Sequence, residues 1–208
     1  MNHLGHFLLT TLLLDGRGAD APPCRVVSVA SVAHAQGELD LFDFNLVAPG
    51  RYTAGRAYAQ SKLANVLFAA ELQRRYGDAG VSSVCCHPGI VRSELFARDV
   101  RASAALAPLA LPFTKSPAQG AATQTYLALA PARELELGGY YAECQPAQPT
   151  GSQGVARDAE TARKLWELSQ SLIAGAESRR AAFGGDEARP AFANDAQRGG
   201  SRIGVTYV

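Results

Sequence analysis

The sequence predicts an α/β fold in which a parallel sheet is covered by helices on both faces. Short β-branched runs at 25–30 and 81–86 alternate with helical segments, which is typical of strand–helix units. The 208 residues are 47% hydrophobic and carry a formal net charge of +1. This composition fits one globular core, and it offers no basic stripe for binding a nucleic acid.

The first half of the chain supplies two helices and one strand. Residues 1–14 are apolar nearly all round and predict a buried helix, and residues 25–30 predict a strand covered on both faces. A polar stretch at 36–55 is expected to be an ordered loop. Residues 56–75 form the clearest helix, because their apolar residues share one face.

The second half continues the alternation. A strand at 81–86 ends at Pro88 and Gly89, because Pro lacks a donor and Gly supplies a turn. The remaining expected elements are a Pro-interrupted segment at 97–113, a helix at 117–129, a third strand at 138–141 and a helix at 158–173. Residues 175–208 hold few apolar residues, so we expect a disordered tail after a domain at 1–174.

Cysteine usage indicates a reducing, cytoplasmic compartment. The four cysteines form no CxxC pair, and the adjacent Cys85 and Cys86 should face opposite sides of a strand. We therefore expect no disulfide framework and no metal site. The apolar N-terminal stretch is too short to span a bilayer, so the sequence predicts no membrane segment in this chain.

Tyr58 and Lys62 are the first candidates for chemistry. A spacing of four places the phenol and the ammonium on one helix face. A phenol exchanges protons near neutral pH only if its pKa of about 10 is lowered, and a neighbouring cation has this effect. The spacing alone equally allows an exposed Tyr–Lys pair.

Two further segments should reach the same edge of the sheet. Ser31 follows the first strand, and residues 87–93 follow the second. Ligands of parallel α/β sheets bind beyond the carboxyl ends of the strands. Ser31 could therefore hydrogen-bond a substrate carbonyl, or simply end its strand by bonding nearby backbone.

The chain resembles the short-chain dehydrogenase/reductases, in particular their retinol-dehydrogenase-like branch. The resemblance covers about the first 175 residues. Its motifs are NHLGHFLLT at 2–10, RVVSVASVAH at 25–34, YAQSKLANVLF at 58–68 and HPGIVRSEL at 87–95. It implies a Rossmann-like, doubly wound parallel sheet, of which this chain holds the C-terminal portion with about three strands.

The resemblance also implies a catalytic tetrad. Tyr58 would exchange a proton with the alcohol or carbonyl oxygen, and Lys62 would lower its pKa and hold the nicotinamide ribose. Ser31 would polarise the carbonyl, and Asn2 would anchor a water in the proton relay. The implied cofactor-binding residues are Tyr58, Lys62, Pro88, Gly89, Val91 and Ser93.

The implied reaction is hydride transfer between NAD or NADP, with NADP favoured, and an alcohol or its carbonyl. The Ala-, Leu- and Pro-rich stretch at 102–113 is expected to be a substrate lid, and its composition suits a lipophilic, retinoid- or steroid-like substrate. An ordinary pair of surface helices is an equal alternative. Relatives often form homodimers, and some are held at a membrane by an N-terminal segment.

The sequence departs from the family pattern at its start. It has no Gly-rich turn between a strand and a helix, so a nucleotide-binding half of roughly a hundred residues is expected ahead of it. We therefore expect a fragment that binds dinucleotide poorly, with the first strand's free edge and the apolar helix at 2–14 uncovered. The alternative function is a non-catalytic short form that binds another protein through that edge.

Overall fold

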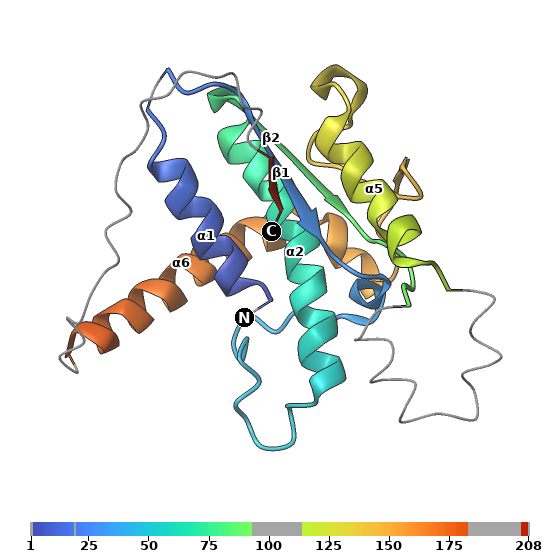
Figure 1. Cartoon of the computed structure of the whole chain (residues 1–208). Coiled ribbons are helices and arrows are strands. Elements are labelled where there is room, and N and C mark those ends of the chain that lie inside the picture. Colours follow the sequence, from blue (N-terminus) through green and yellow to red (C-terminus); the bar gives the residue numbers. More distant parts are fainter. Residues whose placement is uncertain (1, 19, 93–113, 183–204, 208) are drawn as a thin grey trace.

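The computed structural model describes residues 2–18, 20–92, 114–182 and 205–207 (Figure 1). Its centre is a sheet with the strand order β4-β3-β2-β1-β5. The strands are β1 (Cys24–Val29), β2 (Val81–Cys86), β3 (Tyr140–Ala142), β4 (Gln145–Ala147) and β5 (Val205–Tyr207). β2 pairs in parallel with β1 and β3, whereas β4 returns antiparallel to β3.

Helices cover both faces of this sheet. They are α1 (Leu4–Asp15), α2 (Ala54–Tyr76), α5 (Pro117–Leu129) and α6 (Ala159–Ala182). α1, α2 and α6 lie on one side of the strands and α5 on the other (Figure 1). The predicted α/β fold, a parallel sheet covered on both faces, is confirmed.

Each face has its own core. On the α2 side, Phe7, Phe68 and Trp166 pack around Val26. On the α5 side, a second cluster consists of Val27, Val84, Cys86, Leu127, Leu135 and Tyr141. Cys85 belongs to the α2 side and Cys86 to the α5 side, as the strand alternation predicts. Burial raises the pKa of the Cys86 thiol to about 12, so this thiol stays protonated and unreactive.

Local signals set the helix ends close to their predicted places. Thr53 accepts a hydrogen bond from the Arg56 amide at the start of α2. α5 begins with a capping box between Ser116 and Gln119, followed by Pro at the first turn. At the other end of α5, the Arg25 guanidinium donates to the carbonyls of Leu127 and Ala130, where a cation is favourable.

The C-terminal prediction needs two corrections. α6 continues to Ala182 instead of ending at 173, because its last turns are rich in Ala, Glu and Arg, which favour a helix even where they bury little surface. β5 pairs in parallel with β1 over Arg25–Val27. The expectations of a tail without structure from 175 and of an unpaired β1 edge are therefore wrong for these residues.

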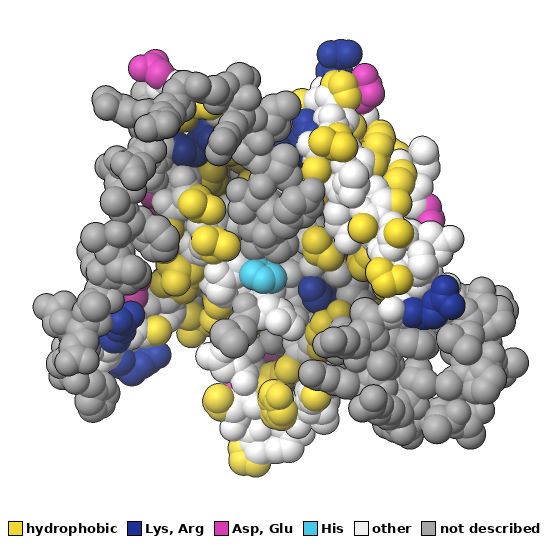
Figure 2. Space-filling view, viewed as in Figure 1, with side chains coloured by type: hydrophobic (Ala, Val, Ile, Leu, Met, Phe, Trp, Pro, Cys, Tyr) yellow, Lys and Arg dark blue, Asp and Glu magenta, His cyan; other side chains and the backbone are white. Residues whose placement is uncertain are grey.

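The exposed apolar face expected on the first helix is present. Leu9, Leu12 and Leu13 are 45%, 60% and 50% exposed. Figure 2 shows hydrophobic side chains gathered over α1 on this face of the molecule. None of the helices in the described ranges combines the length and the apolar character that crossing a bilayer requires.

Candidate active site

The candidate site lies where β1 and β2 end side by side. Val29 is the register partner of Cys86, so the segments that begin at Ala30 and His87 leave the sheet at the same edge. The Ala30 amide donates to the Cys86 carbonyl at 2.7 Å, which ties the two exits together. Parallel strands thus bring Ser31 and the Pro88–Gly89 turn to one edge, as predicted.

Ser31 begins a 3₁₀ turn, η1 (Val32–Gln36), that packs on α2. Its Oγ accepts a hydrogen bond from the Ala33 amide at 3.3 Å, and its hydroxyl proton has no acceptor among the described residues. Gly37 follows η1, and a Cβ there would lie 2.7 Å from the Ala59 carbonyl oxygen. Only glycine allows this approach, which holds the Ser31 segment against the helix that carries Tyr58.

Lys62 is fixed between the first strand and Tyr58. Its Nζ donates to the Val29 carbonyl at 2.9 Å and lies 5.6 Å from the centroid of the Tyr58 ring. Burial lowers the pKa of Lys62. An ammonium has three protons, and one is used here, so the others can reach a ligand. The partly buried Tyr58 hydroxyl bonds to none of the described residues.

Asn2 lies against the same helix. The Asn65 side-chain Nδ2 donates to the Asn2 carbonyl at 3.1 Å. Asn65 follows Lys62 by three residues on α2. The four residues predicted from the family pattern, Asn2, Ser31, Tyr58 and Lys62, are therefore all held on or against α2.

The turn after β2 is held by the strand-like segment before α5. Gly89 has a φ of 79°, a conformation that favours glycine, and its amide donates to Nδ1 of His87 at 3.0 Å. Lys115 exchanges backbone hydrogen bonds with Ile90 and Arg92 at 2.8 and 2.9 Å. Pro88, Gly89 and Val91 thus form an ordered turn, whereas Ser93 and the expected lid at 102–113 lie outside the described residues.

A ring cluster that the sequence reasoning missed joins these segments. Nδ1 of His34 donates to the Ser31 carbonyl at 2.7 Å, and its ring lies 5.0 Å from that of Tyr140. The Tyr140 ring stacks on His87 at 5.8 Å, and burial lowers the pKa of His87. His34 and His87 thus both contact the Tyr140 ring. Their link through Tyr140 has no signal in the sequence, because β3 lies 106 residues away from His34.

Comparisons with known proteins identify the family. Retinol dehydrogenase 12 of Homo sapiens is 44% identical over 176 residues, covering 83% of this chain and 52% of that protein. Dehydrogenase/reductase SDR family member 13 of Homo sapiens is 44% identical over 174 residues, covering 83% of this chain and 45% of that protein. The chain belongs to the short-chain dehydrogenase/reductase family.

A solved structure shares the fold over most of this chain. The crystal structure of an uncharacterised protein from Mycobacterium Paratuberculosis matches with a TM-score of 0.59 and 34% identity, covering 82% of this chain and 56% of that one. The chain spans about half the length of the curated relatives that it matches. No family model matches the sequence.

Short-chain dehydrogenase/reductases use a nicotinamide dinucleotide, and the described residues fit its nicotinamide–ribose end. Lys62 has ammonium protons free for ribose hydroxyls, and the hydroxyls of Ser31 and Tyr58 have no acceptor within the described part of the chain. Gly89 is left-handed, and the Lys115 side chain lies against it, with Cε 3.1 Å from where a Cβ would be. The sequence carries no Gly-rich phosphate loop, so the fit concerns this end of the cofactor only.

Proposed function

We propose that the protein carrying this chain is an NAD(P)-dependent oxidoreductase that interconverts an alcohol and its aldehyde or ketone. The main support is the Lys62 ammonium, which the Val29 carbonyl holds beside the Tyr58 ring at the sheet edge where Ser31 also lies. Its relatives are named retinol dehydrogenases and dehydrogenase/reductases, which favours an enzyme over the non-catalytic alternative.

In this proposal each side chain acts on the substrate oxygen. When a carbonyl is reduced, the Tyr58 hydroxyl gives its proton to that oxygen, and in alcohol oxidation Tyr58 takes the proton back. Lys62 stabilises the negative charge that develops on the phenol oxygen. Ser31 donates its free hydroxyl proton to the carbonyl oxygen and polarises it.

The cofactor would contact Tyr58, Lys62 and the turn that contains Pro88, Gly89, Val91 and Ser93. Bound nicotinamide supplies the hydride in reduction and accepts it in oxidation. We propose NADP over NAD on the family resemblance alone. We propose a lipophilic substrate because several relatives are named for retinol. A homodimer is part of the same proposal, as is a reducing, cytoplasmic compartment, which the four free cysteines support.

A substrate and cofactor panel tests the proposal. Purified protein that contains this chain is incubated with NADPH or NADH and with all-trans-retinal or acetaldehyde, and the loss of reduced cofactor is followed by absorbance. We expect turnover of retinal with NADPH, and slower turnover with NADH or with acetaldehyde. No cofactor oxidation with either aldehyde, from a protein shown to be folded by circular dichroism, would contradict the proposed activity.

A further inference from the structure

Asn65 stands on the same face of α2 as Tyr58 and Lys62, and the sequence reasoning gave it no role. It follows Tyr58 by seven residues and Lys62 by three, spacings that return to one side of a helix. The side chain is 2% exposed. A buried primary amide is costly unless its donors and acceptor are satisfied, so its partners need an explanation.

The two ends of the Asn65 amide have different partners. Nδ2 donates to the backbone carbonyl of Asn2 at 3.1 Å, and Oδ1 lies 3.3 Å from Nδ1 of His3. The Asn2 carbonyl can only accept, which fixes the amide with its nitrogen toward Asn2. Oδ1 therefore faces His3, and the His3 proton must sit on Nδ1.

The other nitrogen of His3 reaches a third helix. Nε2 lies 2.9 Å from the hydroxyl of Ser169 on α6, and the Leu165 carbonyl lies 2.8 Å from the same hydroxyl. The hydroxyl has one proton, so with the His3 proton on Nδ1 it donates to Nε2 instead of Leu165. His3 is 3% exposed, and burial lowers its pKa to about 4, so the ring is neutral near pH 7. A directed chain of hydrogen bonds thus runs from Ser169 through His3 and Asn65 to the Asn2 carbonyl.

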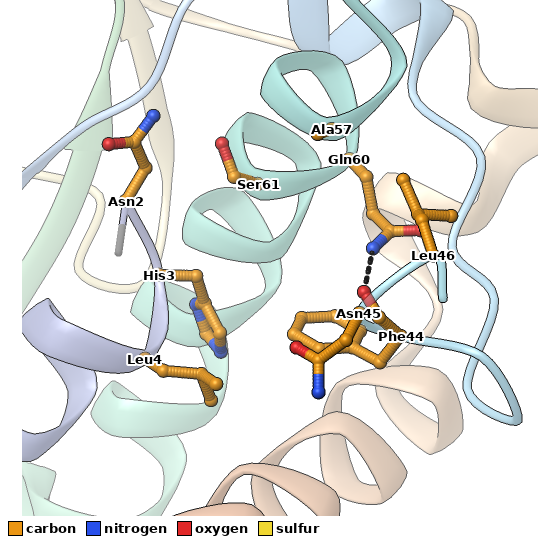
Figure 3. Close-up of a pocket in the computed structure, with 9 residues that line it drawn as sticks. All are labelled: Asn2, His3, Leu4, Phe44, Asn45, Leu46, Ala57, Gln60 and Ser61. Atoms are coloured by element: carbon orange, nitrogen blue, oxygen red, sulfur yellow. Dashed lines mark hydrogen bonds between the residues drawn. The ribbon is translucent and has the colours of Figure 1, made fainter. Parts of the chain in front are cut away.

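Aromatic neighbours hold the His3 ring in its place in the hydrogen-bond chain. The centroids of Phe44, Phe7 and Phe68 lie 5.9, 6.1 and 6.1 Å from that of His3. Figure 3 shows Asn2 and His3 projecting from the start of α1 beside α2, at a cavity of about 150 Å³ that Phe44 and Gln60 also line. Nε2 of Gln60 donates to the Phe44 carbonyl at 2.7 Å, which fixes the side of the cavity that Phe44 lines.

We propose that Asn65 is a positioning residue, which holds the Asn2 backbone carbonyl in a fixed orientation one helical turn from Lys62, with His3 and Ser169 fixing the Asn65 amide. The inference rests on the proposed function, because it assigns Asn65 to the placement of Asn2 in that site. An apolar residue would fill the same space between α1 and α2 without a desolvation cost, so simple packing does not account for the amide.

Two variants test the proposal at different points of the hydrogen-bond chain. Asn65→Leu keeps the size of the side chain and removes both hydrogen bonds. We expect kcat to fall about 10- to 100-fold, because the Asn2 carbonyl loses its orientation, while KM for the carbonyl substrate changes by less than about 3-fold. Ser169→Ala leaves the bond from Asn65 to Asn2 in place, so kcat should fall only about 2- to 10-fold.

Ser178→Ala is the matched control. Ser178 donates to the carbonyl four residues earlier in α6, at 2.9 Å, but it is exposed and far along the helix from His3. We expect kcat and KM to stay at their unsubstituted values. A loss of kcat equal to that of Ser169→Ala would show that any change in α6 matters, which would overturn the inference.

Nitrogen NMR of His3 gives a readout that does not depend on activity. The unsubstituted protein should carry the ring proton on Nδ1, and Asn65→Leu should move it to Nε2, with the signals assigned from His3→Gln. If the unsubstituted protein turns over no carbonyl, the proposed function fails, and the proton position still tests Asn65. A proton that stays on Nδ1 in Asn65→Leu, or a kcat within about 2-fold in an active protein, would overturn the inference.

Discussion

At the scale of single residues, Lys62 shows what the sequence could and could not indicate. The spacing from Tyr58 to Lys62 predicts a shared helix face, and the ammonium does lie near the phenol ring. Its hydrogen bond to Val29 was not predictable, because that partner lies 33 residues away and is a backbone atom. The role of Asn65 was not predictable for the same reason, because its partners His3 and Asn2 lie 62 and 63 residues earlier in the sequence.

His3 makes stability depend on pH. Burial lowers its pKa from 6.5 to about 4, so the unfolded chain binds this proton more readily than the folded one. The stabilisation is fully present above about pH 6.5 and is lost as the pH falls toward 4. We expect His3→Gln to flatten the pH dependence of the free energy of unfolding over this window, by about 3 kcal/mol at most.

Urea unfolding at a series of pH values measures this dependence. His6→Gln is the comparison, because burial also lowers the pKa of His6, but that side chain is only partly buried and its effect should be smaller. Equal slopes for the unsubstituted protein and His3→Gln would contradict the assignment of the effect to His3.

At the scale of elements, boundaries were predictable where local chemistry marks them. The strand at 81–86 and the helix at 117–129 match β2 and α5, since a Pro–Gly stop and a capping box act within a few residues. The short hairpin strand β4 was missed because Gln145, Pro146 and Ala147 have no strand pattern of their own. Its pairing comes from β3, which lies beside it in the fold.

The contact between α5 and the turn after β2 leads to a prediction at this scale. A Cβ at Gly120 would clash with Cγ2 of Val91, and a valine side chain has little freedom to move away. We expect Gly120→Ala to displace the turn, to lower the free energy of unfolding by about 1–3 kcal/mol and to weaken dinucleotide binding.

Gly5→Ala is the control for this change. Gly5 lies in α1, and a Cβ there would meet no atom within 4 Å, so only helix propensity should act. The free energy of unfolding of this variant should rise by up to about 1 kcal/mol. Urea unfolding and a dinucleotide titration compare the two variants. Equal stability of Gly120→Ala and Gly5→Ala would show that Val91 is not the constraint.

At the scale of the whole molecule, the parallel sheet explains why distant motifs form one site. Strand–helix alternation predicted that β1 and β2 pair in parallel, and their register places Ser31 and the Gly89 turn at one edge. Lys62 on α2 reaches the Val29 carbonyl at this edge and so brings Tyr58 to it. β5 could not be foreseen, because its three residues pair with β1 from the far end of the chain. Local composition predicts segments better than it predicts such distant pairings.

The central claim is that Tyr58 transfers the proton in an NAD(P)-dependent reaction, and Tyr58→Phe tests it most directly. Turnover and cofactor affinity are measured on this variant and on Tyr52→Phe, which removes the hydroxyl from an exposed tyrosine. We expect Tyr58→Phe to lose turnover by about 10²- to 10⁴-fold with cofactor affinity nearly unchanged, and Tyr52→Phe to change neither. Turnover of Tyr58→Phe within about 2-fold of the unsubstituted protein would contradict the claim.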